Sequence, residues 1–186
     1  TTAMVGKYFG GQLPEGSRDW AAPESFDTEL KSMASTLRDR YEAAMDAYAP
    51  HKALDEVFQV IQRANKYIDE NAPWTLAKDM EHNGARLAHV LYNLLETIRI
   101  CGVLLSPFMP DSMDKLFDQI SACDSCRTWE AAGRWGVLRS TAAPTKGENL
   151  FPRVDMEKAL AQLETAEAAA KKAALPEVEI EPQLTE

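Results

Sequence analysis

Three shortages in the sequence each exclude a class of protein. The 186 residues include only three cysteines, an odd number, so we expect no disulfide framework and a reducing compartment. No run of about eighteen apolar residues is present to span a bilayer, and the first residues carry no cleavable apolar region, so we expect a cytoplasmic protein without membrane contact. The 20 basic residues are outnumbered by 29 acidic ones. This balance argues against DNA binding, which needs a broad basic surface, but leaves room for a local site with an aromatic platform.

The spacing of the apolar residues is typical of helices. Steps of three and four recur over residues 26–48, 54–68 and 111–120, and we expect Pro50 to end the first of these helices. Residues 83–105 are apolar around more than half of the helix, which predicts the central helix of a bundle. Residues 1–9 resemble the last turns of a helix that Gly10 and Gly11 close. No strand or repeat is evident, so the predicted fold is an all-α antiparallel helix bundle.

The character of the chain changes after Ile120. We expect a bundle domain over residues 1–121 and an irregular extension over 122–155, which is rich in glycine, proline and tryptophan. Residues 156–175 are alanine-rich and predict a C-terminal helix. Residues 176–186 contain four glutamates and no basic residue, which is typical of a solvated acidic linker or tail.

Groups that could support catalysis or metal binding are sparse. The three histidines, His51, His82 and His89, lack carboxylates or cysteines at metal-ligand spacing. Cys123 and Cys126 form a single C-x-x-C, which could be half of a zinc site or a redox pair, but no second pair completes it. We therefore predict neither a catalytic residue nor a metal ligand in this chain.

The stretch NAPWTLAK at residues 71–78 places Pro73 and Trp74 together where a helix should end. Asn65 and Asp69 lie on the preceding helix, about one turn apart. Two interpretations are equally compatible with the periodicity. Trp74 caps the helix and packs into the bundle, or it is an exposed platform, held by Pro73, on which a base of a single-stranded RNA loop stacks.

Several segments resemble one known family. The run NKYIDENAPW at residues 65–74 is similar to the signature of the helical anticodon-binding domain of methionyl-tRNA synthetases. KYFGG at 7–11, LLSPFMP at 104–110 and LFPRVD at 150–155 resemble further segments of that domain, in the family's order. The matches cover the chain from Thr1 to about Asp155.

This resemblance implies a role for four residues. Trp74 matches the tryptophan on which the first anticodon base stacks, and Pro73 matches the proline that sets its position. Asn65 and Asp69 match polar residues that contact the anticodon or fix the loop. The asparagine and arginine that the family uses in its first helix would fall just before Thr1.

The resemblance also implies what the rest of the protein does. Neither the HIGH nor the KMSKS motif of the class I catalytic domain occurs here, so we expect a fragment of the ligase that charges methionine tRNA using ATP. The partners would be the anticodon loop of methionine tRNA, with its CAU anticodon, and the catalytic domain of the same enzyme. ATP and zinc would bind in that catalytic domain, and no cofactor is expected in this fragment. The acidic tail resembles the linker before an OB-type tRNA-binding module.

Two alternatives remain open from the sequence. The chain could be a helical scaffold that binds protein partners, which predicts a buried Trp74 and an exposed apolar groove. It could also be the equivalent domain of a related class I synthetase, for a branched-chain amino acid or cysteine.

Overall fold

The computed structural model describes residues 1–19, 22–151, 156, 160–161, 163 and 165–167 of the chain. Residues Thr1–Leu150 form one compact unit, and the residues from Phe151 onward form a second. Every regular element in the described ranges is helical, which confirms the predicted all-α bundle. The elements of the first unit are α1 (Thr2–Phe9), α2 (Ser25–Ser35), α3 (Leu37–Asp46), α4 (Pro50–Asn71), α5 (Pro73–Leu76), α6 (Met80–Leu105), α7 (Pro110–Gln119), η1 (Asp124–Cys126) and α8 (Trp129–Ala132).

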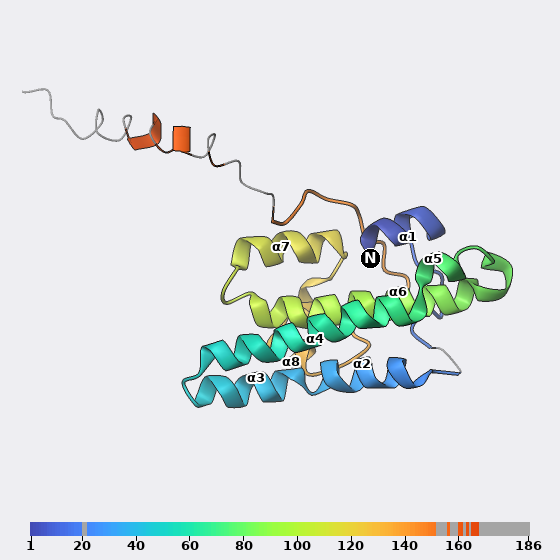
Figure 1. Cartoon of the computed structure of the whole chain (residues 1–186), viewed down its shortest axis with the longest axis horizontal. Coiled ribbons are helices and arrows are strands. Elements are labelled where there is room, and N and C mark those ends of the chain that lie inside the picture. Colours follow the sequence, from blue (N-terminus) through green and yellow to red (C-terminus); the bar gives the residue numbers. More distant parts are fainter. Residues whose placement is uncertain (20–21, 152–155, 157–159, 162, 164, 168–186) are drawn as a thin grey trace, which may run out of the picture. The chain divides into compact units, whose positions relative to one another are not determined.

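Helix α6 is the centre of the first unit. It packs against α1, α2, α4, α5, α7 and α8, and Figure 1 shows α4 running alongside it. By length and composition alone α6 could cross a membrane, but 94% of its most apolar window is buried inside the protein. Burial on nearly every side is what the central helix of a bundle shows, so the predicted central position is confirmed.

The single helix predicted over residues 26–48 is divided into α2 and α3. The division lies at Thr36, whose backbone has φ −98° and ψ 0°. The Thr36 hydroxyl donates to the Ser32 carbonyl at 3.0 Å, and the Ser35 hydroxyl donates to the Lys31 carbonyl at 2.7 Å. Hydroxyl groups that bond the preceding turn compete with the helical ladder and bend it. Apolar spacing continues through this bend, which is why periodicity alone did not reveal it.

Pro50 begins α4, and the prediction that it ends the preceding helix is wrong. Helix α3 ends at Asp46, and the turn is made at Tyr48, which has φ 55° and a side chain that is 95% exposed. Pro50 is the first residue of α4, a position where the missing N–H group costs nothing. Pro50 therefore marks the start of the second helix and not the end of the first.

The extension predicted from residue 122 packs within the same unit as the bundle as far as Leu150. It contains η1 and α8, which are too short to give a periodic pattern. Its main attachment is the buried pair Glu96 and Arg99 of α6, whose side chains are both 0% exposed. The Glu96 carboxylate accepts hydrogen bonds from the backbone N–H groups of Gly136, Val137 and Leu138. Arg99 donates to the carbonyls of Cys126, Ala131 and Arg134.

Cys123 and Cys126 form a disulfide, which the sequence analysis did not predict. The 3-10 turn of η1 brings their Cα atoms to 5.1 Å, inside the range that a disulfide requires. Cys101 is buried in α6 and unpaired. Among the described residues, no group of three or more histidine, cysteine or acidic side chains could hold a metal ion.

The second unit is described at only a few positions. Residues 156, 160–161, 163 and 165–167 are helical, and the Thr165 hydroxyl donates to the Ala161 carbonyl at 2.9 Å. The rest of the predicted helix over 156–175, and the predicted tail over 176–186, lie outside the described residues.

Candidate nucleic-acid interface

The junction of α4 and α5 presents the two residues that the sequence singles out. We call residues 71–74 the α4–α5 corner. Helix α4 ends at Asn71, and Ala72 has a left-handed backbone with φ 42° and ψ 62°. Pro73 is the first residue of α5 and is buried. Proline disfavours the right-handed helical conformation in the residue before it, so α4 has to stop at Ala72 and α5 starts in a new direction.

The Trp74 side chain lies on the surface of the α4–α5 corner. It is 48% exposed, although it is one of the largest apolar groups in the chain. Within the described residues its ring makes no aromatic or cation–π contact. About half of the Trp74 surface is therefore open to solvent, while the adjacent proline is buried in the protein.

Asn65 and Asp69 are exposed on α4, one helical turn apart. In the part of the chain that the structure describes, neither side chain makes a hydrogen bond or ion pair. Their neighbours differ in this respect, because Glu70 pairs with Arg63 at 2.9 Å and with Lys66 at 3.7 Å. Asn65 and Asp69 thus offer free polar groups on the helix that leads to Trp74.

A cavity of about 630 Å³ lies between α5 and the first turns of α6. Its lining includes Leu76 of α5, Asn71 of α4, and Asn83 and Arg86 of α6. Glu70 also lines it, so the cavity combines hydrogen-bond acceptors with one buried cation. The hollow adjoins the short helix that carries Trp74.

Beneath the α4–α5 corner lies a group of buried polar side chains, which we call the Asp27 network. It joins three helices and consists of Asp27 of α2, Tyr67 and Asn71 of α4, and Arg86 and Asn93 of α6. Arg86 donates to Asp27 Oδ2 and to Asn71 Oδ1, both at 2.6 Å. The Tyr67 hydroxyl donates to Asp27 Oδ1 and accepts from Asn93 Nδ2 at 3.1 Å. Asn71 Nδ2 donates to the Tyr67 carbonyl at 2.8 Å.

The electrostatics of the Asp27 network favour an ionised carboxylate. Burial raises the pKa of Asp27, but hydrogen bonds from Arg86, from the Tyr67 hydroxyl and from the Glu24 N–H outweigh it, and the net pKa lies below its usual value. The pKa of Tyr67 is raised, first by burial and then by its bond to Asp27. Tyr67 is therefore a fixed hydrogen-bond donor at neutral pH.

Sequence analysis did not identify the Asp27 network. One signal was available, because Arg86 and Asn93 interrupt a helix that is apolar around more than half of its circumference and was predicted to be central. A buried arginine needs hydrogen-bond acceptors around it. Asp27 and Asn71 could be identified as these acceptors only from the folded structure.

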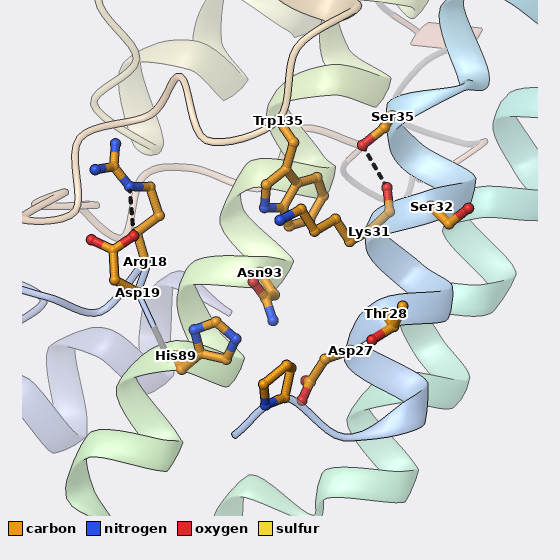
Figure 2. A pocket seen from close by; sticks show the side chains of 11 residues that line it. Arg18, Asp19, Asp27, Thr28, Lys31, Ser32, Ser35, His89, Asn93 and Trp135 are labelled. Carbon is orange, nitrogen blue, oxygen red and sulfur yellow. Dashed lines mark hydrogen bonds and ion pairs between the residues drawn. The ribbon is translucent and has the colours of Figure 1, made fainter. Parts of the chain in front are cut away.

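A second cavity, of about 680 Å³, lies on the α2 side of the network (Figure 2). Asp27 and Asn93 line it together with Lys31, His89 and Trp135. His89 Nδ1 donates to the Ser17 carbonyl at 2.9 Å, and burial lowers the pKa of this histidine. Arg18 at the rim pairs with Asp19 at 3.3 Å, so the charges around this cavity have both signs.

Comparison with solved structures defines the class of the fold. The bundle resembles methionyl-tRNA synthetase from Mycobacterium tuberculosis in the structure bound by methionyl-adenylate, with a TM-score of 0.73 and 30% sequence identity. The match covers 81% of this chain and 29% of that one. The fold is thus that of a helical domain of an aminoacyl-tRNA synthetase.

Comparison of sequences gives the particular family. The family model for the anticodon binding domain of methionyl tRNA ligase matches residues 13–171. The methionine–tRNA ligases of Caldanaerobacter subterraneus subsp. tengcongensis and Bacillus subtilis are 44% and 42% identical over 164 residues. Each match covers 88% of this chain and about a quarter of the relative (25% and 24%). The chain belongs to the family of anticodon-binding domains of methionyl-tRNA ligases.

Proposed function

We propose that the chain is the anticodon-reading domain of a methionyl-tRNA synthetase and that Trp74 stacks on a base of the CAU anticodon. The observation that carries this proposal is the α4–α5 corner, where a half-exposed tryptophan follows a buried proline. An unpaired RNA base has a π-face that stacks on an aromatic side chain, with a contribution of about 1–3 kcal/mol per base. Membership of the anticodon-binding family supports the same role.

The polar groups exposed on the last turns of α4 suit the edges of bases better than phosphates. Asn65 can donate and accept hydrogen bonds, and the Asp69 carboxylate accepts from exocyclic amino groups such as the one cytosine carries. The formal net charge of −9 disfavours phosphate contacts over most of the surface. Recognition would therefore rest on stacking and base edges at one end of α4, with Pro73 fixing the position of the ring.

The chemistry of the whole enzyme would take place outside this chain. We infer that a catalytic domain in the same protein activates methionine with ATP and charges the tRNA, with zinc bound there as well. The methionine–tRNA ligases that resemble the chain are about three and a half times as long, which supports this division. Since tRNA charging accompanies translation, the proposed location is the cytoplasm.

The structure disfavours the first alternative, and the family match disfavours the second. A scaffold that uses its apolar stripes predicts a buried Trp74, whereas the side chain is 48% exposed. A domain for another amino acid does not agree with the family, which is that of methionyl tRNA ligase.

A binding titration with Trp74→Ala tests the proposal. The probe is an RNA hairpin carrying the anticodon stem and loop of methionine tRNA, and the comparison is the same hairpin with its CAU triplet replaced. At about 0.1 M salt we expect the CAU hairpin to bind more tightly, and Trp74→Ala to weaken it by about 5- to 150-fold, the equivalent of 1–3 kcal/mol.

Trp129→Ala is the matched control. Trp129 is a second partly exposed tryptophan, at 38%, and it lies on α8, where its ring contacts Tyr41 and Arg38 of α3 and not α5. Its replacement should leave the affinity for the hairpin unchanged. The proposal fails if the chain binds both hairpins equally or not at all, or if Trp74→Ala binds the CAU hairpin as well as the unsubstituted chain does.

A further inference from the structure

The α4–α5 corner contains a backbone conformation that its own residue disfavours. Ala72 has φ 42° and ψ 62°, a left-handed conformation in which an alanine Cβ crowds the following carbonyl group. Such residues persist only where the surrounding structure holds them, and they gather at functional sites. The conformation of Ala72 decides the direction in which Pro73 and Trp74 leave α4.

The residue before Ala72, Asn71, is held by hydrogen bonds to both the nitrogen and the oxygen of its side-chain amide. Asn71 Nδ2 donates to the Tyr67 carbonyl at 2.8 Å, and Asn71 Oδ1 accepts from Arg86 Nη2 at 2.6 Å. The Ala72 N–H donates to the Ile68 carbonyl at 2.9 Å. The last turn of α4 is thereby tied to α6 through the guanidinium group of Arg86.

That guanidinium group is itself fixed by a second helix. Arg86 Nη1 donates to Asp27 Oδ2 at 2.6 Å, and its guanidinium lies 5.6 Å from the centre of the Phe26 ring. Its side chain is 8% exposed and Asp27 is 3% exposed. The planar fork reaches two acceptors on two helices at once, which the ammonium group of lysine does not reproduce.

We propose that Arg86 is a positioning residue for anticodon recognition, acting through Asn71 to hold the α4–α5 corner in the conformation that presents Trp74. This inference rests on the proposed function. It adds Arg86, Asn71 and Asp27, which are buried beneath the corner, to the residues that determine affinity. Their task is to keep Trp74 preorganised, so that binding does not have to select a minor conformation of the corner.

The expected effect follows from the population of the competent conformation. The apparent Kd rises by the reciprocal of the fraction of molecules that already present Trp74 correctly. If loss of the Arg86 fork reduces that fraction to about 0.1–0.3, the affinity for RNA falls about 3- to 10-fold. This loss is smaller than that of Trp74→Ala, because the ring itself remains.

Fluorine NMR of the 186-residue chain labelled with 5-fluorotryptophan reports on the conformation of the α4–α5 corner in the absence of RNA. The chain has four tryptophans, and Trp74→Phe identifies the Trp74 resonance. In Arg86→Lys we expect this resonance to shift and to change in width or divide as the corner samples other conformations. Asn71→Ala should have the same effect on the Trp74 resonance. The double variant should add little, because both substitutions break the same hydrogen bond between Arg86 and Asn71.

Arg99→Lys is the matched control. Arg99 is the other buried arginine of α6, thirteen residues further on, about 20 Å along the helix axis. We expect Arg99→Lys to lower the stability of the chain without changing any contact of the α4–α5 corner. It should therefore leave the Trp74 resonance and the hairpin affinity unchanged. Spectra and titrations are taken at a temperature where circular dichroism shows every variant folded, and Asn71→Ala serves as the milder variant.

The two readouts separate this inference from the proposed function. An unchanged Trp74 resonance in both Arg86→Lys and Asn71→Ala overturns the inference, and so does unchanged hairpin affinity in these variants when Trp74→Ala binds weakly. If Trp74→Ala retains full affinity, the proposed function is overturned, and the fluorine spectra alone still decide whether Arg86 positions the corner.

Discussion

Glu96 and Arg99 form an ion pair at 2.7 Å in which neither side chain is exposed to solvent. The pair attaches residues 126–138 to the central helix, since its hydrogen bonds reach Cys126, Gly136, Leu138 and their neighbours. Removing one partner leaves an uncompensated charge in the core. The two cavities and the α4–α5 corner depend on the same central helix.

We therefore expect Arg99→Met to lower the free energy of unfolding by about 3–5 kcal/mol, the usual cost of breaking a buried pair on one side. Urea denaturation followed by circular dichroism measures the change. Lys66→Ala is the control, because Lys66 pairs with Glu70 at 3.7 Å on the surface and should cost less than about 0.5 kcal/mol. Equal losses for the two variants would contradict the role given to the buried pair.

A second prediction concerns the dependence of stability on pH. Buried Asp27 is held below its usual pKa by the hydrogen bonds that it accepts. Its ionised form therefore contributes to stability above about pH 4, the pKa range of an unfolded aspartate, and the contribution is lost as the pH falls through the folded-state pKa. At neutral pH the free energy of unfolding should be lower for Asp27→Asn than for the unsubstituted chain. This difference should shrink in acid, where the Asp27 carboxylate is protonated.

Urea denaturation at about pH 7, 5 and 3 measures this difference. Asp69→Asn is the matched variant, because Asp69 is exposed and has no partner among the described residues, and its effect should stay within about 0.5 kcal/mol at each pH. A gap between the unsubstituted chain and Asp27→Asn that is as large at pH 3 as at pH 7 would show that the carboxylate is not the group responsible.

Much of the fold follows from the sequence, because local periodicity determines it. The long stripes of α4 and the apolar circumference of α6 predict two packed helices, and the structure confirms both. The break at Thr36 was not predictable, since it depends on hydroxyl groups that leave the apolar spacing intact. The disulfide was not predicted because a single C-x-x-C fits half of a zinc site as well as a redox pair, and the sequence offers nothing to choose between them.

The candidate site likewise has one part that the sequence predicts and one part that it does not. A proline before a tryptophan marks the α4–α5 corner in the sequence, and the structure places Trp74 on the surface there. The sequence could not reveal what holds the corner, because Asp27, Tyr67 and Arg86 come from three helices and meet only in the folded chain. Exposed elements of a site leave a local signal, whereas their support depends on long-range packing.

The cysteines should differ in reactivity once the disulfide is reduced. Burial raises the pKa of the Cys101 thiol to about 12, so hardly any thiolate forms near neutral pH. Cys123 is exposed on the surface of the extension. After reduction under native conditions, mass spectrometry should find iodoacetamide on Cys123 well before Cys101, whereas all three thiols should react in urea. Early modification of Cys101 in the folded chain would contradict its position in the core.

The last prediction separates stability from recognition at Ala72. Glycine adopts the left-handed conformation without crowding, so Ala72→Gly removes strain of about 1–2 kcal/mol and adds about 0.5–1 kcal/mol of chain entropy cost. We expect the free energy of unfolding to stay the same or to rise by up to about 1.5 kcal/mol. Because glycine also permits other directions at the α4–α5 corner, the affinity for the anticodon hairpin should fall.

Tyr48→Gly provides the comparison for Ala72→Gly. Tyr48 has φ 55° and is 95% exposed in the turn between α3 and α4, so glycine relieves similar strain there without loss of packing. Both variants should change the free energy of unfolding alike, and only Ala72→Gly should weaken hairpin binding. Equal affinities in the two variants would mean that the left-handed residue serves the fold alone, whereas a loss confined to Ala72→Gly ties the strained backbone to the presentation of Trp74.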